Sequence, residues 1–392
     1  MQDSFHRTPS DAIKRSRFRG CLLGGAVGDA LGAPVEFMNL ADIRRSFGPG
    51  GICDYAVAHG RVGAITDDTQ MTLFTAEGLL RAHVRAALHG DGPMFGKATA
   101  QAYLRWLRTQ GVKPKIAEPS GESGWLLEQR ELFSRRAPGN TCLAALRALT
   151  SYADRACNAS KGCGGVMRVA PVGMFVANWI NDAEDQDDRI GQAFAVATDI
   201  AAITHGHPTG QLTAGAFAVV IALLLVGLPL PDAIDRAKTE LRKHDRYEET
   251  LAAIENAEQR AADRPGQTHV LQELGEGWVA EEALAISLYC ALSAPDFESG
   301  VVLAVNHGGD SDSTGAITGN MLGAMMGVDV IPERWRVTLE LADAIGAMAD
   351  DLATVREWRI NHSRGSAERD FYHERYPPCS TTREPNATTD KT

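Results

Sequence analysis

Two short clusters in the sequence place hydroxyl and carboxylate side chains next to one another at the start of expected helices. The first is TDDT at residues 66–69, after a glycine-rich segment, and the second is GGDSDST at residues 308–314. Each offers a hydroxyl and two carboxylates. Mg²⁺ and Mn²⁺ prefer about six oxygen ligands in near-octahedral geometry, more than either cluster supplies alone. A fold that brings both clusters together could hold two such ions.

Helix capping is the alternative interpretation of each cluster. Threonine and aspartate are preferred at helix starts, where negative charge also interacts favourably with the helix dipole. Capping explains each cluster separately but does not explain why the same chemistry recurs beside glycines. The second cluster is not an EF-hand, because it lacks that loop's central glycine and terminal glutamate.

A third element is GDALGAPVE at residues 28–36. Its glycines, four apart, allow close approach of a second helix or a ligand, and tight helix packing is the better interpretation of them. Asp29 is expected to brace the helix. Pro34 ends the helix, and Glu36 follows directly. Spacing alone leaves Glu36 equally a functional carboxylate or a surface residue.

Two loops complete the polar elements. SKGCGGVMR at residues 160–168 exposes backbone N–H groups that could cradle a diphosphate, although it is neither a Walker A motif nor a Rossmann fingerprint. THGHP at residues 204–208 carries two histidines, His205 and His207. The pair lacks a third zinc ligand at a suitable spacing, so a polar turn that contacts a ligand or another loop is favoured over a zinc site.

Helices must position these residues, because almost every periodic segment repeats its apolar residues near 3.6 positions and strand alternation is scarce. The apolar stretch Leu212–Leu228 is long enough to approach a membrane span, but it is rich in alanine and lacks a basic flank, so we expect a buried core helix. The pattern predicts one compact, all-α domain. The expected helices are 68–87, 98–107, 141–153, 190–204, 231–244, 248–262, 315–327 and 335–352.

Composition limits the classes of partner. The 392 residues carry a net charge of −11, which argues against nucleic acid as the main partner. Seven scattered cysteines without CxxC spacing indicate reduced thiols in a cytoplasm-like compartment. The basic run before Cys21 superficially resembles a signal peptide, but Asp29 interrupts the apolar segment that follows. We therefore expect a cytoplasmic protein that contacts no membrane.

The ends of the chain are polar and poor in apolar residues. We predict a flexible extension over residues 1–16 and a single domain over 17–360. A C-terminal tail over 361–392 is expected to be disordered from about residue 377. The 392-residue length is also compatible with two domains, but no composition shift marks a boundary between them.

Together and in this order, these segments resemble the ADP-ribosylglycohydrolase family, which includes dinitrogenase reductase-activating glycohydrolases and ADP-ribosylarginine hydrolases. The resemblance spans Gly20 to about Leu352 and implies an all-α fold with a binuclear Mg or Mn centre. The matching segments are GCLLGGAVGDALGAPVEF, GAITDDTQM, GCGGVMRVAPVG, THGHPTG, NHGGDSDSTGAITGNMLGAMMG and IPERW.

The resemblance also implies roles for individual residues. Candidate catalytic residues are Asp310, Glu36 and Asp67, with Glu36 beside the substrate ribose and either Asp310 or Glu36 transferring the proton. Ser313 stands where many members carry threonine, and Cys163 where some carry asparagine. The metal ligands would be Thr66, Asp67, Asp68, Asp310, Asp312 and Ser313. The ADP-ribose contacts would be Gly162, Cys163, Gly164, Gly165, Val166, Met167 and His205.

The implied reaction is metal-dependent release of ADP-ribose from an ADP-ribosylated protein, with an arginine linkage favoured by the family's base rates. The first alternative is hydrolysis of serine-linked ADP-ribose or of ADP-ribose polymer on the same scaffold. The second is a binding or immunity protein that blocks an ADP-ribosyltransferase toxin or sequesters its modified target. A phosphohydrolase would also use two metals, but it leaves the glycine-rich loop and GDALG unexplained.

Overall fold

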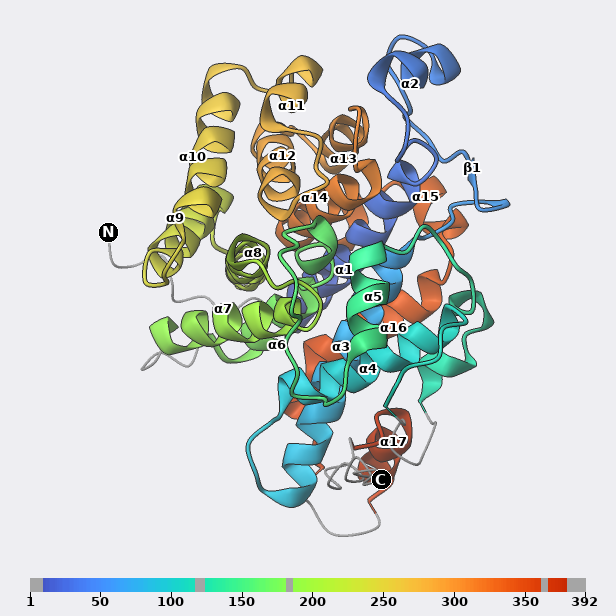
Figure 1. Cartoon of the computed structure of the whole chain (residues 1–392), viewed down its shortest axis with the longest axis vertical. Helices are drawn as coiled ribbons and strands as arrows, with labels where there is room; N and C mark the ends of the chain where they lie inside the picture. The colour runs from blue at the N-terminus through green and yellow to red at the C-terminus, as the bar shows by residue number, and fades with distance from the viewer. Residues whose placement is uncertain (1–9, 117–123, 181–185, 361–365, 379–392) are drawn as a thin grey trace, which may run out of the picture.

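The structure, a computed structural model, is almost entirely helical, which confirms the predicted all-α class (Figure 1). The part of the chain that it describes contains seventeen α-helices and one short antiparallel hairpin of β1 (Val57–Ala58) and β2 (Arg61–Val62). Five short 3₁₀ turns connect helices. The described residues are 10–116, 124–180, 186–360 and 366–378.

The first helices along the chain are α1 (Asp11–Gly32), α2 (Leu40–Phe47), α3 (Asp67–His89), α4 (Phe95–Thr109), α5 (Asn140–Ala148), α6 (Ala170–Ile180), α7 (Gln186–Ala202), α8 (Pro208–Leu225) and α9 (Leu230–Leu241). The remaining helices are α10 (Glu248–Asp263), α11 (Thr268–Leu274), α12 (Ala280–Ser293), α13 (Phe297–Val305), α14 (Ser311–Met326), α15 (Glu333–Thr338), α16 (Ala342–Thr354) and α17 (Ala367–Arg375). The 3₁₀ turns are η1 (Trp125–Glu128), η2 (Arg130–Leu132), η3 (Cys163–Gly165), η4 (Val328–Val330) and η5 (Val355–Glu357).

The predicted single helix over 335–352 is wrong, because two helices, α15 and α16, occupy this stretch. The chain leaves helical geometry between them, and Leu341 adopts a left-handed φ of 59°. The break serves the buried Glu340, whose amide donates to the carbonyl of Gly63 at 2.9 Å and whose carboxylate pairs with Arg136 at 2.9 Å. Between α15 and α16, hydrogen bonds from Glu340 to distant segments therefore replace the hydrogen bonds of a continuous helix.

The predicted boundary at residue 16 also needs correction, since α1 begins at Asp11. Ser10 caps the helix, and the Ser16 hydroxyl accepts a hydrogen bond from the amide of Val328 at 3.2 Å, which ties this first stretch to the domain. Residues 1–9 lie outside the described part of the chain, as do residues 379–392 of the predicted tail. Within that tail, α17 forms a helix and Tyr376 is fully buried.

Helices α1 and α14 pack against each other through glycine in the interior of the molecule (Figure 1). They run antiparallel, and an added Cβ on Gly28 would lie only 1.9 Å from the carbonyl oxygen of Gly315. The Asn320 amide donates to the carbonyl of Cys21 at 2.7 Å across the same contact. The predicted tight packing is therefore confirmed. The facing residues are Gly20 with Gly323, Gly24 with Gly319, Gly28 with Gly315, and Gly32 with Ser311.

Gly28→Ala should destabilise the protein by about 3 kcal/mol or more, because the methyl group would overlap the backbone of α14. The better helix propensity of alanine returns only about 1 kcal/mol. Gly346→Ala on α16 is the matched control, since an added Cβ there meets nothing within 4 Å and should be neutral or slightly stabilising. Urea unfolding of both variants tests this, and equal free energies of unfolding would contradict the contact.

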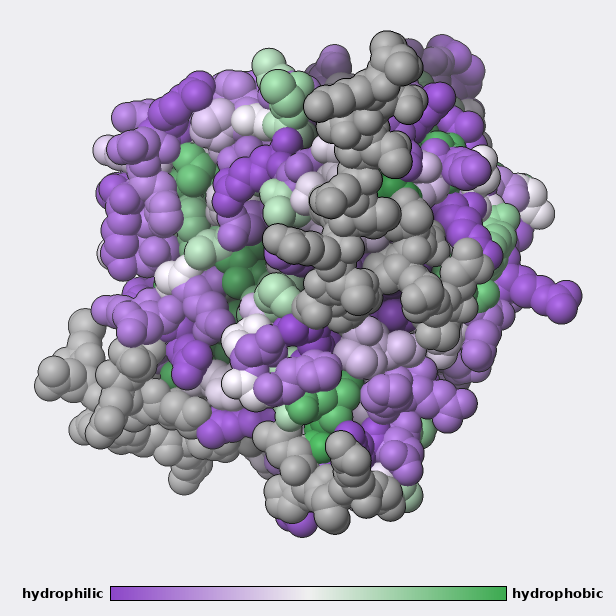
Figure 2. Space-filling view, turned by 60° about the horizontal axis from the view of Figure 1, so that its bottom comes forward, coloured by the Kyte–Doolittle hydropathy of each residue, from purple (hydrophilic) through white to green (hydrophobic). Residues whose placement is uncertain are grey.

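The apolar helix α8 lies in the core. Its length and composition would suit a membrane span, but 89% of its apolar window is buried inside the protein. The predicted core helix over this stretch is therefore confirmed. The face shown in Figure 2 is largely hydrophilic, with hydrophobic residues in small separate patches among the described atoms.

Candidate active site and metal centre

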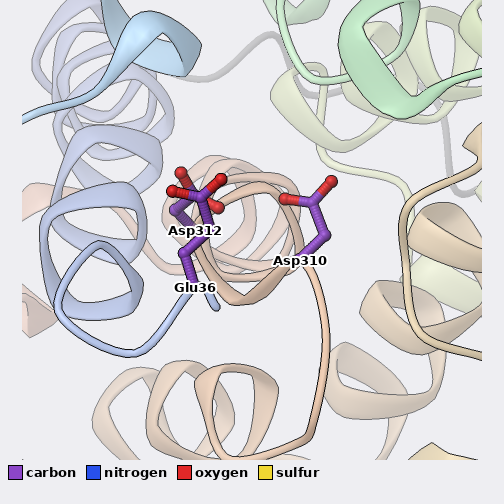
Figure 3. Close-up of side chains that lie close together, drawn as sticks. All are labelled: Glu36, Asp310 and Asp312. Carbon is purple, nitrogen blue, oxygen red and sulfur yellow. The ribbon is translucent and has the colours of Figure 1, made fainter. Parts of the chain in front are cut away.

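The two predicted acidic clusters meet at one place in the fold. Asp310 and Asp312 lie at the start of α14, and Glu36 follows the end of α1 (Figure 3). One carboxylate oxygen from each of the three residues lies within 4.8 Å of one oxygen from each of the other two, and all three residues are buried. Asp67 and Asp68, in the first turn of α3, line the same cavity of about 200 Å³. A pair of clusters separated by more than two hundred residues thus forms one site.

The cavity also brings in most of the residues predicted to contact ADP-ribose. Gly165 and Val166 lie outside its lining, and Val166 belongs to the hydrophobic core. Thr66 also lies outside the lining and is fully buried as the N-cap of α3. The predicted residues that do line the cavity are Glu36, Asp67, Asp68, Gly162, Cys163, Gly164, Met167, His205, Asp310, Asp312 and Ser313.

Asp29 acts as a brace, but the helix that its side chain braces is α3 and not its own helix α1. The fully buried carboxylate accepts hydrogen bonds from the amide of Thr66 at 3.0 Å and from the amide of Thr69 at 3.1 Å. The hydroxyl of Thr69 donates to the same carboxylate at 2.5 Å. Asp29 thereby fixes the first turn of α3, which carries Asp67 and Asp68, against α1.

Burial and crowding raise the pKa of every carboxyl group in the site. Burial first, and then the charge of Asp312, raise the pKa of Glu36 to about 10 and that of Asp29 to about 7. The same two causes hold the pKa values of Asp67, Asp68 and Asp310 well above the usual range. Burial also raises the pKa of Asp312 itself. The site therefore favours either bound protons or bound cations.

The donor set fits divalent cations. Asp68 Oδ1 is buried and has no hydrogen-bond partner among the described residues, which leaves a carboxylate oxygen unsatisfied at the cavity. One oxygen of Asp67 accepts from the amide of Gly139 at 3.2 Å. Hard cations such as Mg²⁺ and Mn²⁺ take carboxylate and hydroxyl oxygens, the groups that Glu36, Asp310 and Ser313 present here.

The glycine-rich loop forms part of the cavity wall. Its Cys163 thiol donates to Asp310 Oδ2 at 2.6 Å, and the Ser313 hydroxyl donates to the Cys163 sulfur at 3.7 Å. On the outer side, Lys161 pairs with Glu249 at 2.6 Å and also with Glu281. The loop is therefore held both by the second acidic cluster and by the first turns of α10 and α12.

The two histidines have different roles. His205 is buried against the glycine-rich loop, and its Nδ1 shares a hydrogen bond with the Thr204 hydroxyl at 2.8 Å. Burial, followed by the charge of Arg168, lowers the pKa of His205 to about 3, so the ring is neutral. His207 instead caps α8 by accepting from the amide of Thr209.

Other cavity-lining residues were missed by sequence analysis. Trp278 lies between α11 and α12, and its neighbour Glu276 accepts a hydrogen bond from the amide of Asp310 at 2.8 Å. The remaining missed residues carry ordinary polar or apolar side chains with no motif around them. They are Ala137, Gly139, Asn140, Thr141 and Cys142.

The family model, two relatives and one solved structure that match this chain all carry names of ADP-ribosyl hydrolases. A family model described as ADP-ribosylglycohydrolase matches residues 10–361. The chain is 25% identical to an ADP-ribosyl-dinitrogen reductase glycohydrolase of Rhodospirillum rubrum, over 83% of this chain and 90% of that protein. It is 23% identical to an ADP-ribosylarginine hydrolase of Pseudomonas putida, over 88% and 79%. A solved structure titled ADP-ribosylglycohydrolase-related protein complex is 28% identical with a TM-score of 0.62, and covers 88% of this chain and 99% of its own.

Proposed function

The chain belongs to the ADP-ribosylglycohydrolase family, and from this premise we propose that it removes ADP-ribose from modified arginine side chains with the help of two Mg²⁺ or Mn²⁺ ions. The observation that carries the proposal is the buried carboxylate cluster, with its unsatisfied Asp68 oxygen, at a cavity closed by a glycine-rich loop. The arginine linkage is supported by the name of the Pseudomonas putida relative.

Some residues of the site would bind the ligand and others would transfer the proton. Divalent ions held by the acidic clusters would supply a Lewis acid to the reaction. The glycine-rich loop would bind the diphosphate through its backbone amides, and neutral His205 would contact the ligand beside it. Cleavage of a glycosidic bond also needs a proton on the leaving group. Asp310 or Glu36 would deliver it, and the Cys163 thiol fixes Asp310 Oδ2 for this purpose.

The location of the protein and two alternative functions remain predictions. A cytoplasmic location agrees with the free state of the six described cysteines, while Cys379 lies outside the described residues. Blocking of an ADP-ribosyltransferase toxin is the binding-protein alternative, and hydrolysis of serine-linked ADP-ribose or of polymer is the enzymatic one.

The purified protein should release free ADP-ribose from arginine-linked peptides, and a chelator should abolish the release. We expect the rate to fall by about 10³-fold in excess EDTA and to return with Mg²⁺ or Mn²⁺, because the clustered carboxylates lose the ions that organise them. Product release from arginine-, serine- and aspartate-linked peptides is followed in parallel. Full activity in EDTA would contradict the metal mechanism, and cleavage of serine linkages alone would contradict the arginine assignment.

A further inference from the structure

Two aromatic side chains lie at the entrance of the cavity and are left facing solvent. Phe37 directly follows Glu36 and is 75% exposed, and Trp278 is 38% exposed and lines the cavity. Their rings stack nearly parallel, with an interplanar angle of 15° and centroids 5.8 Å apart. They come from connections far apart in the chain, the first after α1 and the second before α12. The stacked pair therefore joins the turn that carries Glu36 to the segment that carries Trp278 into the cavity lining.

The backbone fixes the Trp278 ring relative to the acidic cluster. The Trp278 carbonyl accepts a hydrogen bond from the amide of Cys163 at 3.1 Å. Two residues earlier, the carbonyl of Glu276 accepts from the amide of Asp310 at 2.8 Å. The intervening Gly277 has a φ of +83°, which a side chain would disfavour. The backbone of the Glu276–Trp278 segment is thus tied to the glycine-rich loop at one end and to the backbone amide of Asp310 at the other.

Phe37 is placed in a similar way on the other side. Glu36 points its carboxylate into the cluster, within 4.8 Å of Asp310 and Asp312. A turn in which the amide of Met38 donates to the carbonyl of Val35 at 2.9 Å encloses Glu36 and Phe37. Phe37 therefore follows, in the same turn, the carboxylate beside which the reacting sugar carbon would bind, and its ring is exposed on the outside of the cavity.

The chemistry of this entrance favours a cation. The faces of phenylalanine and tryptophan rings carry negative electrostatic potential and attract guanidinium groups. Behind them, Glu36 and four aspartates supply the acceptor oxygens that line the cavity. Adenine also stacks on aromatic rings, but two riboses and a diphosphate separate it from the reacting carbon. The group attached directly to that carbon is the modified side chain, and it lies nearest to the pair.

We propose that Phe37 and Trp278 bind the guanidinium of the ADP-ribosylated arginine and so determine which linkage the site accepts. This inference rests on the proposed function. Because the guanidinium is cationic both before and during cleavage, the contact contributes equally to substrate binding and to the transition state. It therefore acts on KM, with little effect on kcat.

The experiment compares Phe37→Leu, Phe37→Tyr, Trp278→Leu and the wild type on ADP-ribosyl-arginine. Leucine keeps an apolar side chain but removes the aromatic face, whereas tyrosine keeps that face. Phe47→Leu is the matched control, because Phe47 is 37% exposed at the end of α2 and is not part of the stacked pair. Affinity for free ADP-ribose, which lacks the leaving group, is measured by calorimetry on each protein, and melting curves check folding.

Phe37→Leu and Trp278→Leu should raise KM by about 5- to 30-fold with kcat within about twofold, while Phe37→Tyr and Phe47→Leu stay near the wild type. Affinity for free ADP-ribose should be unchanged in all of them. Loss of ADP-ribose affinity would overturn the inference in favour of an adenine platform, and an unchanged KM would overturn it outright. In both cases the wild type still cleaves the substrate. A wild type that does not cleave arginine linkages refutes the proposed function itself.

Discussion

Asp310→Asn is expected to lower kcat on arginine-linked ADP-ribose by about 10³-fold or more while the protein stays folded. The substitution removes a charge that lies within 4.8 Å of the carboxylates of Glu36 and Asp312 and removes the proton-binding oxygen pair. It leaves intact the backbone bond from the amide of Asp310 to Glu276, which orients the loop. Steady-state kinetics with saturating Mg²⁺ or Mn²⁺, together with circular dichroism, measure the effect.

Asp29→Asn is the control for this prediction, since Asp29 is equally buried and acidic but serves as a brace. Its carboxylate oxygens accept hydrogen bonds from Thr66 and Thr69. In asparagine, an NH₂ group replaces one of these oxygens and would face the donors of Thr66 or Thr69 without an acceptor. We expect a lower midpoint of urea unfolding and a much smaller loss of kcat in the folded protein. Equal losses of kcat in both variants, with folding intact, would show that the assigned roles are wrong.

Asp312→Asn is expected to raise the melting temperature of the metal-free protein by several degrees and to reduce the stabilisation by Mg²⁺ or Mn²⁺. Asp312 is the charged neighbour that contributes most to the raised pKa values of Asp29, Glu36 and Asp67. Removing its charge relieves repulsion among all of them. In the wild type, ions at about 100 times their dissociation constant should add about 2.7 kcal/mol per site.

The repulsion among these carboxyl groups also makes the stability of the metal-free protein depend on pH. A carboxyl group whose pKa is raised in the folded state holds a proton that the unfolded chain has already lost, so folding is favoured at low pH. This contribution disappears as pH rises through the folded-state pKa, about 7 for Asp29 and about 10 for Glu36. Stability without metal should therefore fall between about pH 5 and pH 8, and less steeply in Asp312→Asn.

Four sets of melting curves test this prediction, with the wild type and Asp312→Asn each measured in chelator and in excess cation. If Asp312 were only a helix cap, the variant would melt lower in chelator, because a negative charge in the first turn of α14 stabilises the helix. It would then also shift as much as the wild type on adding cation. That pair of results would remove Asp312 from the metal centre.

Local pattern in the sequence predicted about half of the described helices, because a buried face repeats every 3.6 residues wherever the helix lies. It failed where a distant partner decides the backbone. Periodicity continues across α15 and α16, yet the chain breaks between them so that Glu340 can reach Arg136 and Ile65, which are 204 and 275 positions away. No window of sequence contains that interaction.

In the candidate site, too, some residues could be predicted from local motifs and others could not. TDDT and GGDSDST are recognisable because each packs several oxygen donors into a few residues, and both clusters do line one cavity. Trp278, Asn140 and Thr141 reach that cavity only through the path of their connections, so their residue types carry no local signal. Val166 shows the opposite error, since its place in a glycine-rich loop predicts a ligand contact and its side chain is in the core.

The contact between α1 and α14 has a consequence for how the protein is made. Cys21 and Asn320, which bond across it, are 299 positions apart. At about 5–20 residues per second, a ribosome needs roughly 15 to 60 seconds to travel between them. During that time α3 can already pack against the nascent α1, but the glycine face of α1 has no partner until α14 is made. The two acidic clusters of the candidate metal site can meet only after α14 has left the ribosome.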